Sequence, residues 1–471
     1  MSSKMQKVGL VVTGAVIGVL ISLNFSAIAD KPAPTPLPVE ELRTFSEIFG
    51  RIKSDYVEPV EDKKLIKEAI TGMVSGLDPH SAYLDAESFK ELQVGTQGEF
   101  GGLGIEVGME DGFVKVVSPI DDSPAYKAGI KSGDLVIKLD DTAVKGLTLN
   151  DAVKRMRGKP GTSIKLTVLR KGEQSPLIFT LTRDVIKVKS VKVKDLEPGY
   201  TSIRISQFQE HTGENLAQAI QDTYRKNGGV LKGLVLDLRN DPGGLLNSAV
   251  AVSAAFLPQD VLVTYTDGRT DDSKMKLNAS REHYLRGNFR DDYIAKLPEG
   301  IKKVPMVVLV NAGSASASEI VAGALQDHKR ATVMGTQTFG KGSVQTIVPL
   351  ANNTAIKLTT ARYYTPSGRS IQAKGIVPDV IVEDPNSPGA DMGIREADLE
   401  RHLSNPTDKD AKPQPKPETK ADSKPEQKSA AGETAKKPEA GGPNGEKPDF
   451  QLDQALNHLK GLPVIAKPQT T

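Results

Sequence analysis

Three short apolar runs, two of them followed by small residues and a helical pattern, constrain the fold of this chain most strongly. "GLVLDLRN" (233–240), "VPMVVLV" (304–310) and "ATVMG" (331–335) read as buried strands because most of their residues are apolar. The first run is followed by "DPGG" and an apolar helix over 245–256, and the second by a Gly, Ser and Ala segment that leads into another helix. Repeated strand–helix units indicate an α/β layer structure over about 185–383.

The N-terminus has the pattern of a secretory signal. Lys4 and Lys7 precede an apolar run over 8–23, and Ala27 and Ala29 fit a small-x-small cleavage site. Cleavage after Ala29 is therefore expected. An uncleaved anchor, which would keep the chain near the inner membrane, is the alternative, although the run is shorter than the roughly 20 residues of a membrane span. Both alternatives export the remaining chain.

Composition excludes several classes of function. The chain has 61 basic and 59 acidic residues, so nothing indicates the concentrated positive charge that nucleic-acid binding needs. It has no cysteine, which excludes disulfides, thiolate catalysis and cysteine-based metal sites. Residues 405–448 are rich in Pro, Lys, Glu, Ala and Gly and lack apolar bulk, which predicts disorder.

Residues 98–183 combine short strands with glycine turns, and "GGLGIEV" (101–107) resembles the carboxylate-binding loop of PDZ domains. In such a loop, successive backbone N–H groups capture the terminal carboxylate of a peptide, and the next strand pairs with it. The resemblance assigns peptide binding to Leu103, Gly104, Ile105 and Glu106, with Ile105 where the family often has Phe. Alone, this module would make the chain an adaptor.

"NAGSASASEIVAGALQD" (311–327) offers three candidate nucleophiles at the start of a predicted helix, Ser314, Ser316 and Ser318. A serine in the first helical turn lies beside free N–H groups that favour an oxyanion. Position slightly favours Ser316, which lies at the start of the first helical turn. Ser314 comes earlier, in the loop, and Ser318 is already within the turn. His328 would be roughly 18 Å from Ser316 along the helix, too far to be its base. Spacing does not exclude His80 or the other four histidines, but nothing beside them resembles a triad signature.

A lysine can replace histidine as the base if burial lowers its pKa. "TFGKGSVQTIVPL" (338–350) places Lys341 between two glycines, and a strand here would put Lys341, Ser343 and Gln345 on one face. On this stretch alone, a solvent-facing lysine is the more common arrangement.

Taken together, "LDLRNDPGG", "GSASASE", "TFGKGSVQ" and the PDZ-like module resemble the C-terminal processing (tail-specific) proteases over about 42–384. The resemblance implies a Ser–Lys dyad of Ser316 and Lys341. It also implies support of the lysine by Gln345 and an oxyanion hole formed by the N–H groups of Ala317 and Gly244.

Two further roles follow from the same resemblance. Asp327 matches an aspartate that is sometimes counted as a third member of the site, although a surface carboxylate at the helix end is the simpler interpretation. Arg157 occupies the place of an arginine that couples the PDZ domain to the dyad in some relatives, and a plain surface charge is the alternative.

The expected fold is an α/β serine-protease core of the ClpP/crotonase-like type with an inserted PDZ-like domain and N-terminal helices. The expected parts are a signal peptide (1–29), a linker (30–38), an N-terminal helical region for dimerisation (39–97), a PDZ-like domain (98–183), a protease core (184–384), a disordered linker (385–449) and a C-terminal helix (450–463).

The sequence therefore predicts a periplasmic serine endopeptidase that recognises the C-termini of substrate proteins, preferably apolar ones, and cleaves them through an acyl-enzyme. No metal or cofactor is expected. The resemblance also implies a homo-oligomer formed through terminal helices and leaves a possible adaptor lipoprotein open. A non-catalytic PDZ adaptor or a chaperone that binds protein tails is the alternative.

Overall fold

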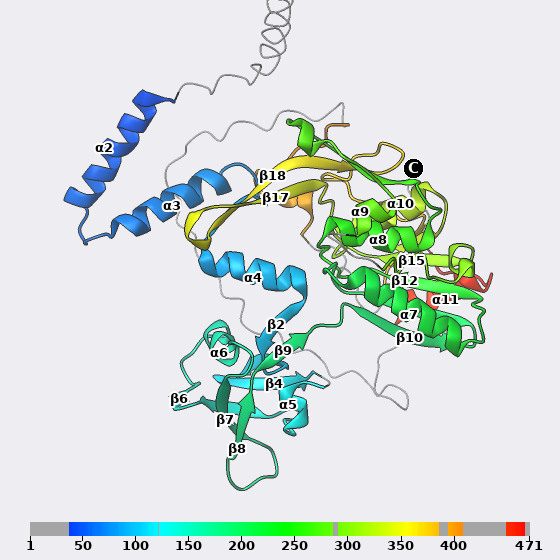
Figure 1. Ribbon diagram of the computed structural model, residues 1–471, viewed down its shortest axis with the longest axis horizontal. Helices are drawn as coiled ribbons and strands as arrows, with labels where there is room; N and C mark the ends of the chain where they lie inside the picture. The colour runs from blue at the N-terminus through cyan, green and yellow to red at the C-terminus, as the bar shows by residue number, and fades with distance from the viewer. Residues whose placement is uncertain (1–36, 121, 286–290, 386–393, 408–448, 467–471) are drawn as a thin grey trace, which may run out of the picture. The chain divides into compact units, whose positions relative to one another are not determined.

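The computed structural model describes residues 37–120, 122–285, 291–385, 394–407 and 449–466 (Figure 1). The predicted signal peptide and most of the predicted linker lie outside these residues. Contacts divide the chain into two compact units, residues 1–70 and 71–471. None of the described helices is long and apolar enough to cross a membrane.

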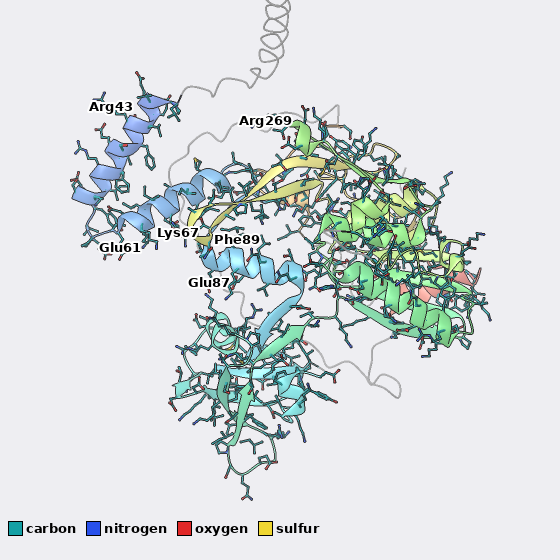
Figure 2. The ribbon with its side chains drawn as sticks, in the orientation of Figure 1. Arg43, Glu61, Lys67, Glu87, Phe89 and Arg269 are labelled. Atoms are coloured by element: carbon teal, nitrogen blue, oxygen red, sulfur yellow. The ribbon has the colours of Figure 1, made fainter. Side chains whose placement is uncertain are left out.

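The first unit contains helix α2 (Val39–Asp55) and most of α3 (Asp62–Ser75). Helix α2 buries none of its residues. Figure 2 shows its side chains, with Arg43 labelled. The apolar side chains that remain exposed on α2 recur at helical spacing. They are Val39, Leu42, Phe45, Ile48 and Ile52.

The β-rich region of the second unit forms a sheet of order β3–β4–β5–β7–β8, with β6 paired to β5. Helices α5 (Pro124–Lys127) and α6 (Leu149–Met156) belong to the same region, and apolar residues of α6 share one core with the strands. The strands are β3 (Ile105–Glu110), β4 (Phe113–Pro119), β5 (Leu135–Leu139), β6 (Thr142–Ala143), β7 (Ser163–Leu169) and β8 (Leu177–Thr182). A separate pair, β2 (Glu99–Gly102) and β9 (Asp184–Lys187), flanks the sheet in sequence.

The α/β core contains a six-stranded sheet of order β10–β11–β12–β15–β16–β19, parallel except for the pairing of β10 with β11. Its strands are β10 (Val191–Glu197), β11 (Tyr200–Ile205), β12 (Gly233–Asp237), β15 (Met306–Val310), β16 (Thr332–Gly335) and β19 (Val380–Ile381). All residues of β12 and β15 are buried, as their apolar runs predict. This sheet and its helices confirm the expected α/β class.

Helices cover both faces of this sheet (Figure 1). Alternate strand residues such as Leu236 and Val308 share a core with α7, α8 and α10. The intervening residues, such as Val235 and Leu309, pack with α11. The helices are α7 (Thr212–Lys226), α8 (Leu246–Phe256), α10 (Ala317–Asp327) and α11 (Phe450–Leu459).

A second sheet has the order β1–β18–β13–β14, with β17 also paired to β18. It brings a strand from the N-terminal part of the chain against strands that lie some 270 residues further on. Its members are β1 (Ala82–Leu84), β13 (Leu262–Gly268), β14 (Lys276–Asn278), β17 (Ser343–Pro349) and β18 (Ala355–Tyr364). Short elements complete the structure: α4 (Ala86–Gln97), α9 (Arg281–Tyr284) and 3₁₀ turns at Asp271–Ser273, Glu299–Lys302, Ala351–Asn353 and Glu396–Asp398.

Residues 394–407 differ from the expectation that 385–449 is a disordered linker. Glu396 is completely buried, and the buried Asn405 donates a hydrogen bond to the Gln372 carbonyl at 2.7 Å. Composition averaged over the long polar segment hides this short stretch, which is held by polar contacts rather than by apolar bulk. The expectation was therefore wrong for residues 394–407.

Candidate active site

The three candidate serines have different environments around the start of α10. The Ser314 hydroxyl donates to the Leu238 carbonyl at 2.8 Å, and the Ser318 hydroxyl donates to the Asp241 carbonyl at 2.9 Å. Both side chains are completely buried, so both serve to hold the turn together. Within the described part of the chain, no backbone carbonyl accepts the Ser316 hydroxyl, which leaves Ser316 as the serine available for chemistry.

Ser316 is the N-cap of α10 and has a strained backbone, with φ of 57° and ψ of −111°. Non-glycine residues rarely adopt a positive φ, and such strain concentrates at functional sites. Gly243 of the "DPGG" segment packs directly against this turn. A Cβ atom on Gly243 would lie 2.9 Å from the Ser316 Cβ and 2.8 Å from the Ala317 nitrogen, so only glycine allows this approach.

The two predicted oxyanion donors have free N–H groups. Among the described residues, neither the Ala317 N–H nor the Gly244 N–H has a hydrogen-bond acceptor. Gly244 has φ of 147°, and a Cβ atom there would lie 2.1 Å from the Phe208 carbonyl oxygen. The N–H of Leu245 and the carbonyl of Gly243 bond to Phe208 and fix the loop on both sides of Gly244. The geometry is suited to an oxyanion hole.

Glu319 links Ser316 to the loop that carries Lys341, here called the lysine loop. The sequence analysis did not identify Glu319 as a site residue. Its Oε2 accepts the N–H of Ser316 at 2.8 Å and the N–H of Lys341 at 2.9 Å. Its Oε1 accepts the Thr338 hydroxyl at 2.6 Å and the Gly340 N–H at 2.7 Å. Complete burial raises the pKa of Glu319 to about 7, against the lowering effect of these bonds. The pattern Ser-x-x-Glu is a capping-box signal that could have identified it.

Lys341 lies in the loop before β17, so strand alternation does not place it on one face with Gln345. Burial, and to a smaller extent the positive charge of Lys357, lower the pKa of Lys341 to about 8. The negative charges of Glu396, Glu319 and Asp78 oppose this decrease. With a pKa of about 8, roughly one lysine in ten is neutral at pH 7, which is far more than for an exposed lysine and supplies the form that a general base requires.

Gln345 belongs to a polar network beside this loop. Its amide nitrogen donates to the Ser343 hydroxyl at 3.0 Å and to the Thr359 hydroxyl at 3.3 Å. Thr359 in turn donates to Asp78, whose carboxylate also accepts the Ser81 hydroxyl. The predicted contact of Gln345 with the Lys341 side chain is not among these bonds, so its support of the lysine stays a prediction.

A second network reaches the lysine loop from the other side. His80 Nε2 lies 2.7 Å from Glu396 Oε2, and the Gln372 amide donates to Glu396 Oε1 at 2.8 Å. Gln372 also accepts the N–H of Gly342, and the Glu396 N–H donates to the Phe339 carbonyl. The segment "LDPHSAY" (77–83), which contains His80, therefore lies close to the site, which spacing in the sequence did not indicate.

Tyr363 of β18 also contacts the serine. Burial raises the pKa of Tyr363, and a hydrogen-bonding contact with the Ser316 side chain opposes this increase. Its position next to Ser316 depends on the pairing of β18 with β13 and β17, so no local sequence signal identifies it.

Asp327 and Arg157 lie apart from these groups. Asp327, at the end of α10, accepts the Ser367 N–H at 2.9 Å and pairs with Arg369. Burial tends to raise the pKa of Asp327, but the hydrogen bonds to this turn and the charge of Arg369 together lower it. Arg157 ends α6, is exposed and lies over the Phe100 ring, 4.8 Å from its centre. Among the described residues, neither side chain is hydrogen-bonded or ion-paired to Ser316 or Lys341, so both assignments stay predictions.

The predicted peptide-binding residues flank the start of an edge strand. Leu103 and Gly104 form a loop between β2 and β3. Their N–H groups have no acceptor among the described residues, and β3 lies at one edge of its sheet. Gly104 has φ of 72° and packs against Ser123, which a side chain would prevent. Ile105 and Glu106 begin β3, so an added peptide strand could pair there.

Comparisons with known proteins match this arrangement. Residues 199–382 match the profile described as Peptidase family S41, and residues 101–180 match the PDZ domain. Residues 21–88 match the profile described as Activating protease CtpB N-terminal domain. Within the described residues, no group of His, Asp and Glu side chains could hold a metal ion.

Individual relatives cover most of the chain. It is 49% identical over 375 residues to the carboxy-terminal-processing protease of Bartonella bacilliformis, covering 79% of this chain and 82% of the relative. It is 35% identical over 384 residues to the carboxy-terminal processing protease CtpB of Bacillus subtilis, covering 78% and 75%. A solved photosystem II D1 C-terminal processing protease is 30% identical, with 72% of this chain and 86% of that chain covered and a TM-score of 0.40.

The fold and the matches define a serine-type peptidase with a PDZ domain. The chain belongs to peptidase family S41, among the carboxy-terminal processing proteases.

Proposed function

We propose that the chain is an endopeptidase in which Ser316 is the nucleophile and Lys341 the general base. The bridge made by Glu319 carries the proposal. One carboxylate oxygen accepts both the Ser316 N–H and the Lys341 N–H, so the two backbone nitrogens lie within about 6 Å of each other. Burial of the lysine supplies the lowered pKa that the chemistry needs.

The proposed reaction has two steps. Neutral Lys341 takes the Ser316 hydroxyl proton as the serine oxygen bonds to the scissile carbonyl carbon. The N–H groups of Ala317 and Gly244 stabilise the oxyanion. The C–N bond then breaks, and the Lys341 ammonium gives its proton to the leaving amine. Lys341 next takes a proton from water as the water oxygen bonds to the acyl carbon, and the Lys341 ammonium returns that proton to the Ser316 oxygen as the ester C–O bond breaks. Gln345 supports the lysine loop through Ser343 and Thr359.

The experiment compares Ser316→Ala and Lys341→Ala with Ser175→Ala and Lys303→Ala, two exposed positions away from the site. An unstructured protein with an apolar C-terminus is the substrate, and circular dichroism checks the fold. The first two variants should produce no fragments, whereas the controls should cleave as the unchanged chain does. Full cleavage by Ser316→Ala or Lys341→Ala would refute the dyad. Binding of the tail without cleavage by the unchanged chain would favour the adaptor or chaperone alternative.

The loop Leu103–Gly104 and strand β3 are proposed to bind the substrate C-terminus. Two unbonded N–H groups beside an edge strand support this, because a carboxylate accepts such donors and a peptide can extend the sheet. Replacing the terminal carboxylate of one peptide substrate by an amide tests it. Loss of charge-assisted hydrogen bonds should lower kcat/KM by roughly ten- to a hundredfold, mainly through KM. Equal kcat/KM for both peptides would exclude carboxylate recognition.

Arg157 is proposed only as a residue that couples the PDZ domain to the dyad, and Asp327 only as a residue that supports the site.

Assembly through α2 is proposed from its exposed apolar face. In the described chain this face is uncovered, and contiguous apolar surfaces mark interfaces. Phe45→Glu should lower the oligomer mass measured by light scattering, whereas Arg43→Glu, labelled on the same helix in Figure 2, should not. An unchanged mass in both would contradict it. Helix α11, by contrast, packs on its own chain.

Export to the periplasm by residues 1–29 is also proposed, from the charged start, the apolar run and the Ala-x-Ala ending. Fusing these residues to a reporter that is active only after export tests this proposal.

Whether an adaptor lipoprotein takes part can be tested by comparing cleavage by the purified chain with and without an extract of membrane lipoproteins.

A further inference from the structure

Arg239, which follows β12, has a guanidinium group whose five N–H bonds are all used. Its Nε and Nη2 donate to Asp237 at 2.9 and 2.8 Å. Its Nη1 and Nη2 donate to Asp449 at 2.8 and 2.6 Å, and Nη1 also donates to Gln451 at 3.1 Å. The side chain is only 9% exposed. A buried guanidinium is tolerated because each donor has a partner, and two of these partners lie more than 200 residues away in sequence.

Asp449 and Gln451 lie at the start of helix α11. Further contacts cap this helix and bind it to the α/β core. Asp449 also accepts the Leu452 N–H at 3.1 Å and so caps the helix. Gln451 donates to the Val382 carbonyl at 2.8 Å. The buried residues Leu452 and Ala455 pack against the sheet, alongside residues of β12 and β15. The helix is therefore a fixed part of the core, although residues 408–448 separate it from the preceding described segment.

The backbone around Arg239 is joined to the serine turn on both sides. The Leu238 carbonyl accepts the Ser314 hydroxyl, and the Asn240 N–H donates to the Asn311 side chain at 2.8 Å. The Asp241 carbonyl accepts the Ala315 N–H at 3.0 Å. Gly243 then lies against Ser316. A displacement of Arg239 would therefore be transmitted to the loop that carries the Gly244 N–H.

We infer that Asp449 is a positioning residue for the loop Asn240–Gly244 and that it acts through Arg239. The C-terminal helix α11 thus contributes to acylation, although it packs on the face of the sheet opposite α8 and α10. This inference rests on the proposed role of the Gly244 N–H as an oxyanion donor.

The physical reason is the cost of an unpaired buried charge. Without the Asp449 carboxylate, two of the five Arg239 donors lose their acceptor while the guanidinium remains buried. The side chain must then turn toward water or draw another acceptor inward, and either movement shifts the backbone at Arg239. A misplaced oxyanion donor lowers the rate of acylation rather than the affinity for substrate.

The test compares Asp449→Ala and Asp449→Glu with Asp453→Asn, an exposed position one turn along α11. The full chain is used, and kcat, KM and the rate of Ser316 labelling by a fluorophosphonate are measured. Asp449→Ala should lower kcat and labelling by roughly ten- to a hundredfold with KM within about threefold, because losing one oxyanion donor outright costs about 10²–10³. Asp449→Glu should restore part of the rate, and Asp453→Asn should change nothing. Unchanged kcat and labelling in folded Asp449→Ala would overturn the inference.

Amide hydrogen exchange over residues 238–244 gives a second measurement that does not depend on catalysis. Exchange in this segment should be faster in Asp449→Ala than in Asp453→Asn. Faster exchange in α11 alone, with no change at 238–244, would overturn the inference even if activity fell. If Asp449→Ala does not fold, Gln451→Ala, which removes one acceptor of the same guanidinium, is measured in its place. A wild-type chain that is never labelled at Ser316 would refute the proposed dyad, while the exchange comparison would still decide the role of Asp449.

Discussion

The lowered pKa of Lys341 predicts the pH dependence of acylation. A lysine with a pKa of about 8 is neutral in about one molecule in ten at pH 7 and in about nine in ten at pH 9. If the neutral form is the base, acylation of Ser316 should increase about tenfold between these pH values and then level off. A solvent-exposed lysine with the ordinary value of 10.5 would instead give a rate that still increases tenfold per pH unit at pH 9.

The variant Lys357→Gln tests the electrostatic cause of the lowered pKa of Lys341. The positive charge of Lys357 lowers the pKa of Lys341, so its removal should raise that pKa. The pH profile should then move to higher pH, and the rate at pH 7 should fall although the plateau at high pH is unchanged. Lys303→Gln, an exposed lysine that does not contribute to this effect, is the matched control.

The assay is the single-turnover rate of Ser316 labelling by a fluorophosphonate between pH 6 and 10, with circular dichroism at each end of the range. Burial makes the largest contribution to the lowered pKa of Lys341, so the inflection should remain below 10.5 even in Lys357→Gln. A rate that does not depend on pH between 6 and 9 would refute Lys341 as the base. A shift of the Lys357→Gln profile to lower pH would refute the electrostatic explanation.

Three further predictions concern the groups around the serine. Burial raises the pKa of Asp241 from 3.8 to about 7, so the folded state holds a proton that the unfolded state loses, and stability should fall as the pH rises from about 4 to 7, by at most about 4 kcal/mol. Asp241→Asn should therefore stabilise the chain at pH 8 but not at pH 4 in urea unfolding, and equal effects at both would contradict this. Glu319→Gln should lower kcat at least tenfold and the free energy of unfolding by roughly 2 kcal/mol, because its amide group faces N–H donors, whereas normal kinetics would show that the bridge is dispensable. Ser318→Ala should lose about 1 kcal/mol of stability in thermal unfolding yet still be labelled at Ser316, and loss of labelling in a folded variant would weaken the choice of serine.

Local features of the fold could be predicted well from the sequence. The apolar runs of β12 and β15 and the helix that begins at Ala317 depend on neighbouring residues, so periodicity and capping patterns identify them. The amphipathic pattern near the C-terminus likewise predicted a helix, and α11 is there. Its partner could not be predicted, because residues 408–448 separate it from the preceding described segment and carry no signal for its docking position.

Only part of the candidate site could be predicted, again because a sequence pattern reports mainly on residues that are near neighbours in the chain. The order of the motifs singled out Ser316, Lys341 and Gly244, but the Ser-x-x-Glu pattern of Glu319 was overlooked although it was visible. His80 and Glu396 could not have been paired, because 316 residues separate them. The strand alternation that suggested a contact between Lys341 and Gln345 fails because β17 begins only at Ser343.

The sequence by itself determined which residue types stand at the turns and which segments form strands and helices, because these depend on interactions between near neighbours. Tertiary structure alone decided how Lys341 ionises. Its pKa depends on burial and on the charges of Lys357, Glu396, Glu319 and Asp78, which come from distant parts of the chain. Tertiary structure also decided that Ser316, unlike Ser314 and Ser318, does not donate its hydroxyl to a described backbone carbonyl, because the carbonyls that bind the other two follow β12.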